Sequence, residues 1–503
     1  MKTHFLVPCI ALFSLLLFVG CPQTPDAPVK PSVDNTEKEK DITESEPPVE
    51  TATPEMPLTI PAPPPVVDQP APPVVEQPAP PVVEPPAPPV VEQPAPPQET
   101  AEEKVVRERV AQLGGTVRKN PDGRIIGIVI DNNDLALADM QAIGKLIDLE
   151  TIRISGPSVD DSYVEAMSGL IKLKSVDIEN GEITDKSLEI LKTLPDINAL
   201  LLRRNLKLTD NAVKLFAEFP KLQTLKILYN NFSPTSLYDL ENLKSIRILD
   251  LRGLQVDDLT FIFLSELENL EELRVRSGSV SNAGIAELVK CQKLKTLELQ
   301  DTSVGAGCGE FFKEMKGLRT LQIFRGGEFG AEAVSELGVL TNLEFLQLRA
   351  ISCNNEALLA LKPLVNLRRV DFSELPGVDS ATIIDVLKSY PRLVDVRIFA
   401  ISVDDSVAAF LATVPALRAV ALPATSITDA GLDALTVLPN LGTLEIYANK
   451  ERLTVQGAGV LSKLKTLQRL VIPETLDDPA LRSAIRESSP NCVISVNTYS
   501  QET

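Results

Sequence analysis

From residue 125 onward, apolar side chains recur at the first, fourth and sixth positions of a unit that returns every 24 residues with few exceptions. The first copies are Ile125-Ile128-Ile130, Leu149-Ile152-Ile154 and Leu173-Val176-Ile178. Apolar residues two positions apart predict a short strand with one buried face. The constant spacing predicts an array of repeats in one body and argues against a set of separate domains.

Each unit carries a second signal after its strand, a branched apolar residue followed by polar residues, as in Ile183-Thr184-Asp185 and Ile427-Thr428-Asp429. Thr, Ser and Asp can accept hydrogen bonds from the free N–H groups that begin a helix. The apolar residues then change to helical spacing, as at Leu432, Leu435 and Leu438. We therefore expect units of strand, turn and short helix, stacked so that their leucines form one continuous core.

These residues and motifs resemble the leucine-rich-repeat family, in the variant with Ile-Thr-Asp after the strand and a leucine-bearing helix, which is known from lipid-anchored bacterial proteins. The resemblance covers residues 125 to 496. It implies an α/β fold, a curved right-handed solenoid with a parallel concave sheet, and a scaffold that binds other molecules without specifying which. Asparagine stands at the family's asparagine position in some units only, at Asn133, Asn205, Asn230 and Asn449, so we expect no continuous asparagine ladder.

The first residues have the layout of a secretory signal, with Lys2, an apolar stretch from Phe5 to Val19, and Gly20-Cys21. Residues 17–21 resemble the lipobox of bacterial lipoproteins, which implies a lipid on Cys21. We expect residues 1–21 to be a signal peptide with a lipobox. The exported chain would then be anchored to the bacterial cell envelope, on its periplasmic or surface side. The alternative is an ordinary signal peptide that is cut nearby.

Proline dominates the segment after Cys21, which holds 25 of the chain's 40 prolines and repeats an octapeptide that first reads Ala-Pro-Pro-Val-Val-Glu-Gln-Pro from Ala71. Such a segment cannot form a packed core, and a polyproline rod from Pro61 to Pro97 would extend roughly 115 Å. We expect residues 22–103 to be a disordered acidic stalk, with docking of proline-binding modules as the alternative. Residues 104–124 are expected to form an N-terminal cap, and residues 125–503 the solenoid with its C-terminal cap.

Charge and histidine content exclude several functions. The net charge is −20, of which residues 22–103 contribute −13 (16 acids, 3 bases), residues 104–503 contribute −8 (53 acids, 45 bases) and Lys2 contributes +1. No basic domain is present, so a nucleic-acid partner is not expected. The only histidine is His4, inside the predicted signal, so the exported chain has no imidazole for a catalytic triad or a zinc site. We expect no enzyme activity and no cofactor.

The remaining cysteines and paired aspartates are expected to be structural. The spacing of Cys291, Cys308, Cys353 and Cys492 matches no zinc motif, and buried thiols are the simplest interpretation, although a disulfide from Cys291 to Cys308 stays open. Aspartate pairs occupy the same helix-start position in distant units, so no metal site is expected from them; the pairs are Asp160-Asp161, Asp257-Asp258 and Asp404-Asp405.

The outward residues of the strands carry the functional prediction, because the core does not constrain them. Arginine and aromatic residues, which are enriched in binding hot spots, gather there. The predicted partner-binding residues are Arg203, Lys226, Arg252, Arg274, Arg276, Phe324, Phe345, Arg349, Arg397, Phe399 and Tyr447. We expect a protein, or an acidic polymer, to bind this concave face. The alternative is that the arginines pair with acids on neighbouring strands and the chain is an architectural envelope protein without a discrete ligand.

Overall fold

The structure is a computed structural model, and it describes residues 99–448 and 452–497. The chain separates into two compact parts, residues 1–90 and residues 91–503, and all described residues belong to the second part. The predicted signal peptide, Cys21, most of the predicted stalk and Asn449 lie outside the described residues.

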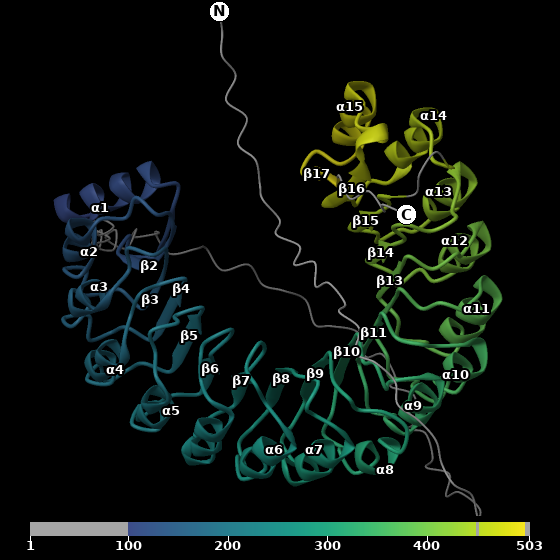
Figure 1. The fold of residues 1–503 in the computed structure, drawn as a ribbon. Coiled ribbons are helices and arrows are strands. Elements are labelled where there is room, and N and C mark those ends of the chain that lie inside the picture. The colour runs from purple at the N-terminus through teal and green to yellow at the C-terminus, as the bar shows by residue number, and fades with distance from the viewer. Residues whose placement is uncertain (1–98, 449–451, 498–503) are drawn as a thin grey trace, which may run out of the picture. The chain divides into compact units, whose positions relative to one another are not determined.

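The described residues form one sheet of 17 strands, in which β2 to β17 follow each other in chain order and pair in parallel. β1 pairs antiparallel with β2. The strands line the inside of the arc drawn in Figure 1. They are β1 Thr116–Lys119, β2 Ile125–Asp131, β3 Thr151–Ser155, β4 Ser175–Glu179, β5 Ala199–Arg203, β6 Thr224–Lys226, β7 Ile248–Asp250, β8 Glu272–Arg276, β9 Thr296–Gln300, β10 Thr320–Phe324, β11 Phe345–Arg349, β12 Arg369–Ser373, β13 Asp395–Phe399, β14 Ala419–Ala421, β15 Thr443–Glu445, β16 Arg469–Pro473 and β17 Val493–Asn497.

Short helices cover the outside of the arc, and all except α1, which precedes β1, lie between two successive strands (Figure 1). The α-helices are α1 Ala101–Gln112, α2 Leu137–Ile143, α3 Asp161–Glu165, α4 Asp185–Leu191, α5 Asp210–Phe216, α6 Asp258–Leu264, α7 Asn282–Glu287, α8 Gly309–Phe312, α9 Ala331–Glu336, α10 Asn355–Leu359, α11 Ser380–Leu387, α12 Asp405–Leu411, α13 Asp429–Leu435, α14 Val455–Ala458 and α15 Pro479–Ser488. The 3₁₀ helices are η1 Pro234–Asn242, η2 Leu288–Lys290, η3 Leu337–Val339, η5 Gly459–Lys463 and η6 Glu474–Leu476.

The core is a set of apolar ladders that run through the whole sheet. Leu249, Leu273 and Leu297, each at the fourth position of its unit, are in register on β7, β8 and β9, and all three are fully buried. Each unit leaves its apolar edge open until the next unit covers it, so the buried area grows only by stacking. The predicted α/β solenoid with parallel strands is confirmed.

The N-terminal cap begins earlier than expected. Thr100 caps α1, and its amide and the amide of Ile125 both donate to the carboxylate of Glu103, which also lies 3.3 Å from Arg124. Glu103 is only 2% exposed. The predicted boundary between stalk and cap at residues 103 and 104 is therefore wrong, because a glutamate that was counted as stalk charge is a buried hydrogen-bonding part of the cap.

The other end of the array is covered by α15, which buries Leu481 and Ile485, and by β17, which pairs with β16. Asp478 caps α15 and accepts from the amides of Ala480 and Leu481. The end of the parallel sheet therefore does not expose the last leucine layer to water.

In the described residues, asparagine side chains at the family's asparagine position connect neighbouring units at only one place. The Asn205 side chain accepts from the backbone amide of Gly181, and the backbone amide of Asn205 donates to the side chain of Asn230. Units with and without an asparagine turn after the strand with a residue at positive φ, such as Arg204 at 54°, Ala350 at 51° and Gly253 at 81°. The discontinuous ladder that was expected from the sequence is thus accompanied by left-handed turns.

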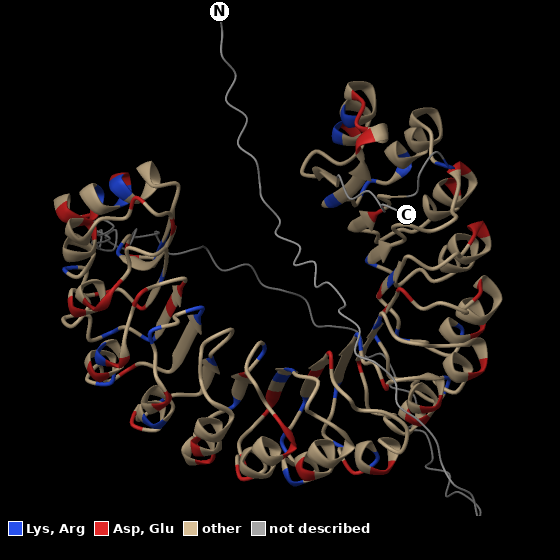
Figure 2. Cartoon of the chain, viewed as in Figure 1, with Lys and Arg blue, Asp and Glu red and all other residues tan. Residues whose placement is uncertain are grey.

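Charged residues of both signs are interspersed along the arc (Figure 2). Among the described residues, no helix is both long and apolar enough to cross a bilayer.

Candidate functional site

The concave face is built from the third, fifth and seventh positions of each unit, which alternate with the buried fourth and sixth positions. Parallel register sets equivalent residues side by side, as for Asp250, Arg274 and Glu298 on β7, β8 and β9. Every predicted partner-binding residue occupies one of these positions, from Arg203 on β5 to Tyr447 after β15. They spread over many strands, so the structure does not gather them into one patch.

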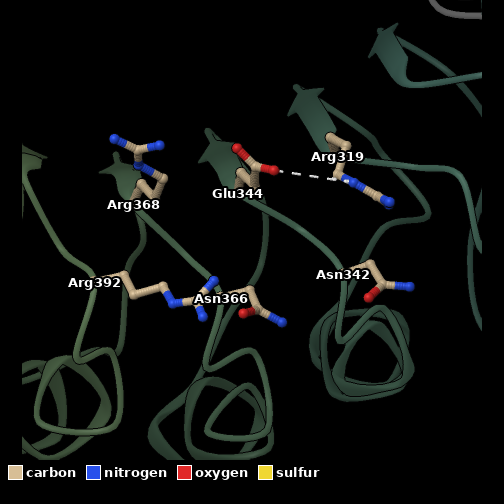
Figure 3. Close-up of a pocket in the computed structure, with 6 residues that line it drawn as sticks. All are labelled: Arg319, Asn342, Glu344, Asn366, Arg368 and Arg392. Carbon is tan, nitrogen blue, oxygen red and sulfur yellow. Dashed lines mark ion pairs between the residues drawn. The ribbon is translucent and has the colours of Figure 1, made fainter.

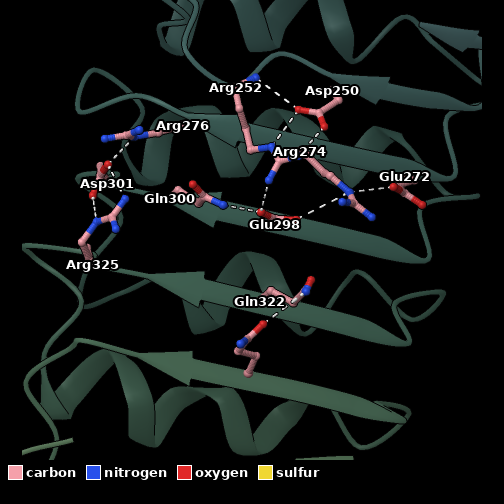
Figure 4. A network of polar contacts seen from close by, with 11 residues as sticks. Asp250, Arg252, Glu272, Arg274, Arg276, Glu298, Gln300, Asp301, Gln322 and Arg325 are labelled. Carbon is pink, nitrogen blue, oxygen red and sulfur yellow. Dashed lines mark hydrogen bonds and ion pairs between the residues drawn. The ribbon is translucent and has the colours of Figure 1, made fainter. Parts of the chain in front are cut away.

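A network of ion pairs occupies the face over β7 to β9 (Figure 4). The guanidinium of Arg252 lies 2.7 Å from the carboxylate of Asp250 and 3.0 Å from that of Glu298. Arg274 lies 2.7 Å from Glu272 and 3.5 Å from Glu298. Asp250 is 1% exposed and Glu298 4%. For Arg252 and Arg274 the structure therefore shows the alternative considered above, arginines that pair with acids across the ladder.

Arg276 belongs to a second group of charges at the strand ends. Asp301 lies 2.5 Å from Arg276 and 2.7 Å from Arg325. Its hydrogen bond with Arg325, joined by the one with Arg276, outweighs burial and holds the pKa of the Asp301 carboxyl below its ordinary value. Asp301 therefore stays ionised and neutralises both arginines in part.

Charges over β3 to β6 are also largely compensated. Arg203 lies 3.2 Å from Glu179, and its guanidinium carbon is 5.7 Å from the centre of the Tyr229 ring. Burial raises the pKa of Asp177, although Arg153 opposes this rise. Lys226 is half-buried on β6, and its side chain forms no ion pair within the described ranges.

The aromatic residues near the C-terminal end are not available as expected. Phe399 (5% exposed) and Tyr447 (9%) pack with Val471 in a small apolar cluster of their own. Arg397 lies 2.6 Å from Glu445 and donates to the Tyr447 hydroxyl over 2.8 Å, reaching across β14, where the small Ala421 occupies the equivalent position. The prediction that Phe399 and Tyr447 are exposed is wrong, because neighbouring strands bring apolar side chains against them.

The middle of the concave face, over β10 to β12, combines aromatic side chains with exposed arginines. Phe324 and Phe345 are half-buried, and the Arg349 side chain is 44% exposed, although it pairs with Glu374 at 3.0 Å. Arg369 pairs in register with Phe345, and its guanidinium carbon lies 4.5 Å from the centre of that ring. Arg369 was not among the predicted residues, although Phe345, at the same third position of the preceding unit, was the signal that could have found it.

A comparison with protein families gives one match: a profile described as a leucine-rich repeat region matches residues 211–476, about half of the chain. The chain belongs to the leucine-rich-repeat family. No curated protein sequence matches it.

Solved leucine-rich-repeat structures are also similar to this chain. A leucine-rich-repeat protein of Leptospira interrogans is 18% identical (TM-score 0.41), with 75% of this chain and 92% of that one covered. An internalin of Listeria monocytogenes is 14% identical (TM-score 0.39), with 82% and 100% covered. A chain in the yeast Rad7 and Elc1 complex is 15% identical (TM-score 0.44), with 78% and 91% covered.

The aspartates of this leucine-rich-repeat chain link neighbouring units, a role that the sequence analysis missed. The first aspartate of each pair caps its own helix, as Asp404 does for α12. The second reaches the next unit, as Asp405 does by accepting from the amide and the hydroxyl of Thr428 at 2.7 and 2.6 Å. The regular Ile-Thr-Asp spacing was the available signal, but a single unit does not show which neighbour the carboxylate meets.

The same link recurs between several units. Asp161 meets Thr184 and Ser187, and Asp258 meets Ser281. Burial acts to raise the pKa of Asp161, but hydrogen bonds from Ser187 and Thr184 together lower it, so the carboxylate form is retained. In residues 99–448 and 452–497, no group of three or more metal-ligand side chains could hold a metal ion.

The cysteines of the leucine-rich repeats are free thiols buried in the array. Burial raises the pKa of Cys291 and of Cys353 to about 11, and it raises the pKa of Cys308, beside Glu336, to about 12. Cys492 is 7% exposed. A disulfide between Cys291 and Cys308, left open by the sequence, is not formed.

Proposed function

We propose that this leucine-rich-repeat chain is an exported, lipid-tethered binding module whose concave face takes up a protein partner over β10 to β12. The observation that carries the proposal is the pairing of half-buried phenylalanines with accessible arginines there: Phe345 under Arg369, and Phe324 in register with Arg349. Aromatic and arginine side chains are enriched among the residues that contribute most to protein binding. Nothing in the stacking of the core requires them on this face.

Neighbouring regions of the face are less suited to an incoming partner. At the proposed site, Arg349 and Arg369 pair with Glu374 and Asp395, whose side chains are about a third exposed. Over β7 to β9, by contrast, the arginines pair with the buried carboxylates of Asp250 and Glu298, for which a new partner would have to compensate. Over β13 to β15, the aromatic side chains are buried. The proposed site is therefore narrower than the surface expected from the sequence.

The test places a photo-crosslinking amino acid at Gln347, between the two phenylalanines, and compares it with the same amino acid at Val437, which is 67% exposed and lies after α13. We expect a discrete protein adduct from position 347 only, identified by mass spectrometry of membranes from the source cells. We further expect Phe345→Ala to reduce the adduct, whereas Val365→Ala, which trims an exposed apolar side chain elsewhere, leaves it unchanged. Equal adducts at both positions would contradict the proposal.

The lipid tether rests on Lys2, the apolar stretch and the sequence Leu17 to Cys21, which resembles a lipobox. Metabolic labelling with a fatty acid tests it. We expect label in the native chain and none in Cys21→Ser, together with a shift of the variant out of the membrane fraction. Label that persists in the variant would show that the tether lies elsewhere.

One observation favours a second function, that of an architectural envelope protein without a discrete ligand: most concave arginines are already paired within the chain. The crosslinking comparison decides between the two, since an architectural protein gives no discrete adduct at position 347. Under either function we expect no catalytic turnover, because the exported chain has no imidazole and its solenoid thiols are buried.

A further inference from the structure

A polar hollow of about 540 Å³ lies at the edge of the sheet where β10 to β13 begin, away from the outward strand positions of the concave face. Figure 3 shows its side chains in two rows, one at the strand starts and one on the turns that lead into them. The first row is Arg368, Glu344 and Arg319, and the second is Arg392, Asn366 and Asn342. No apolar side chain lines the hollow.

Two of its three arginines are without a partner inside the chain. Arg319 already has partners inside the chain. One of its nitrogens donates to the carbonyls of Lys316 and Gly317, and its Nε lies 3.9 Å from Glu344. By contrast, the side chains of Arg368 and Arg392 are exposed and make neither an ion pair nor a hydrogen bond with any part of the chain that the structure describes. This differs from the concave face, where most arginines meet a carboxylate.

The two asparagines present open acceptors beside these cations. Asn366 donates its amide to the carbonyl of Thr341 over 2.9 Å, and Asn342 donates to that of Lys316 over 3.1 Å. Each amide is thereby oriented, and within residues 99–448 and 452–497 neither Oδ1 accepts a hydrogen bond. In another unit the corresponding Oδ1, that of Asn269, accepts from Lys293 over 2.7 Å. Unlike Asn269, Asn342 and Asn366 therefore keep an open acceptor beside the two arginines of the hollow.

We propose that this edge hollow binds an acidic saccharide. The guanidiniums of Arg368 and Arg392 would pair with its carboxylate or sulfate groups, and Oδ1 of Asn342 and Asn366 would accept from its hydroxyls. Successive strands are about 4.8 Å apart, so Arg368 and Arg392 offer their charges on neighbouring units. Arg418, also exposed, lies two units beyond Arg368 at the start of β14, with Val394 at the equivalent position between them. This arrangement suits a linear anionic chain that crosses the units.

Other polyanions fit the hollow less well. A protein partner would need apolar or aromatic anchors, and the hollow has none. Single-stranded nucleic acid would need aromatic platforms for its bases and a basic domain, whereas this chain has a net charge of −20. The combination of unpaired cations and hydroxyl acceptors favours an acidic sugar.

Binding of the full chain to soluble polymers tests the proposal by surface plasmon resonance. The probes are polygalacturonate for carboxylate, heparin for sulfate, dextran as a neutral saccharide and poly-glutamate as an acidic polypeptide. We expect binding to one or both of the acidic saccharides that weakens as salt is added, and little binding to dextran or poly-glutamate. Preference between polygalacturonate and heparin identifies the anionic group.

The double variant Arg368→Ala/Arg392→Ala is expected to weaken this binding by about tenfold or more, because it removes two charged hydrogen-bond donors. Lys465→Ala/Arg486→Ala removes the same charge from exposed sites near the C-terminal end and should bind as the native chain does. All substituted side chains are exposed, so thermal unfolding should be unchanged. Equal binding by both double variants, tight binding of poly-glutamate, or no binding of either acidic saccharide would overturn the proposal.

Discussion

At the residue scale, the aspartate in the second position of each Asp-Asp or Thr-Asp pair does more than favour a helix start. Asp405 satisfies the amide and the hydroxyl of Thr428 in the next unit, while Thr428 in turn caps α13. One carboxylate thus fixes the position of the following helix. Such contacts stabilise the stacking of units independently of the leucine core.

We expect Asp405→Ala to lower the free energy of unfolding by about 1 to 3 kcal/mol, because the amide of Thr428 loses its acceptor at a partly buried site. Urea unfolding followed by circular dichroism measures the change. The control is Glu332→Ala, which removes an acidic side chain from the first turn of α9 without breaking a bond between units. An equal loss in both variants would mean that only the helix start is affected.

The residue after each strand is a second point where a single side chain matters. Gly253 has φ of 81°, and a Cβ there would lie 2.1 Å from the Tyr229 ring. We expect Gly253→Ala to destabilise the protein by at least about 1 to 2 kcal/mol, the cost of a left-handed non-glycine residue. Ala350→Gly, at φ of 51°, should instead change stability by less than about 1 kcal/mol, since relief of strain offsets chain entropy. Thermal unfolding of both variants checks the contrast, and a neutral Gly253→Ala would refute it.

At the scale of elements, neighbouring strands determine the charge state of the concave face. Burial raises the pKa of Asp371, which lies under Arg397 and beside Ser373, whereas the bonds with Arg325 and Arg276 lower the pKa of Asp301. The pKa values of these two carboxyls are therefore shifted in opposite directions. The protonation of each carboxyl on the concave face therefore depends on the side chains of the neighbouring strands as well as on its own strand.

Asp301 supplies the pH prediction. Its pKa is lowered from 3.8 in the folded chain, so its stabilising contribution is present above pH 3.8 and is lost as pH falls through the lowered value. We expect Asp301→Asn to cost less than about 1 kcal/mol at pH 7, as is usual for a partly exposed ion pair. The difference from the native chain should disappear in strongly acidic solution. Urea unfolding at both pH values measures it, and a difference that grows on acidification would reverse the assigned sign.

At the scale of the whole molecule, the array depends on its ends. The last leucine layer is covered by α15 and β17, where Leu481 and Ile485 are buried. A solenoid without such a cap exposes a full layer of its core. The two faces proposed for ligands lie in the middle of the array, so their geometry depends on both ends being closed.

Deletion of residues 477–503 should therefore cause aggregation and a lower midpoint of thermal unfolding, because it exposes Leu470 and Ile472, which are now fully buried. Deletion of residues 498–503 alone is the control and should behave as the native chain does. Size-exclusion chromatography with light scattering distinguishes the two variants. A monomeric and equally stable longer deletion would show that the cap is dispensable.

The amino-acid sequence by itself determined the fold of the solenoid. Spacing alone identified the buried ladders, the strand of each unit and the helix starts, because burial of one leucine in every unit demands the same position in the next. It also indicated which side chains point outward. These are local and periodic properties, and each follows from a few consecutive residues.

Only the tertiary structure decided what the outward residues do. Arg252 meets Glu298, 46 residues later, and Arg397 reaches Tyr447, 50 residues later. Phe399 and Tyr447 are covered by neighbouring strands, while Arg368 and Arg392 have no ion-pair partner among the residues that the structure describes. The core places no constraint on these positions, so their partners depend on which side chains the register brings within reach. That depends on the distances between units, which no single repeat contains.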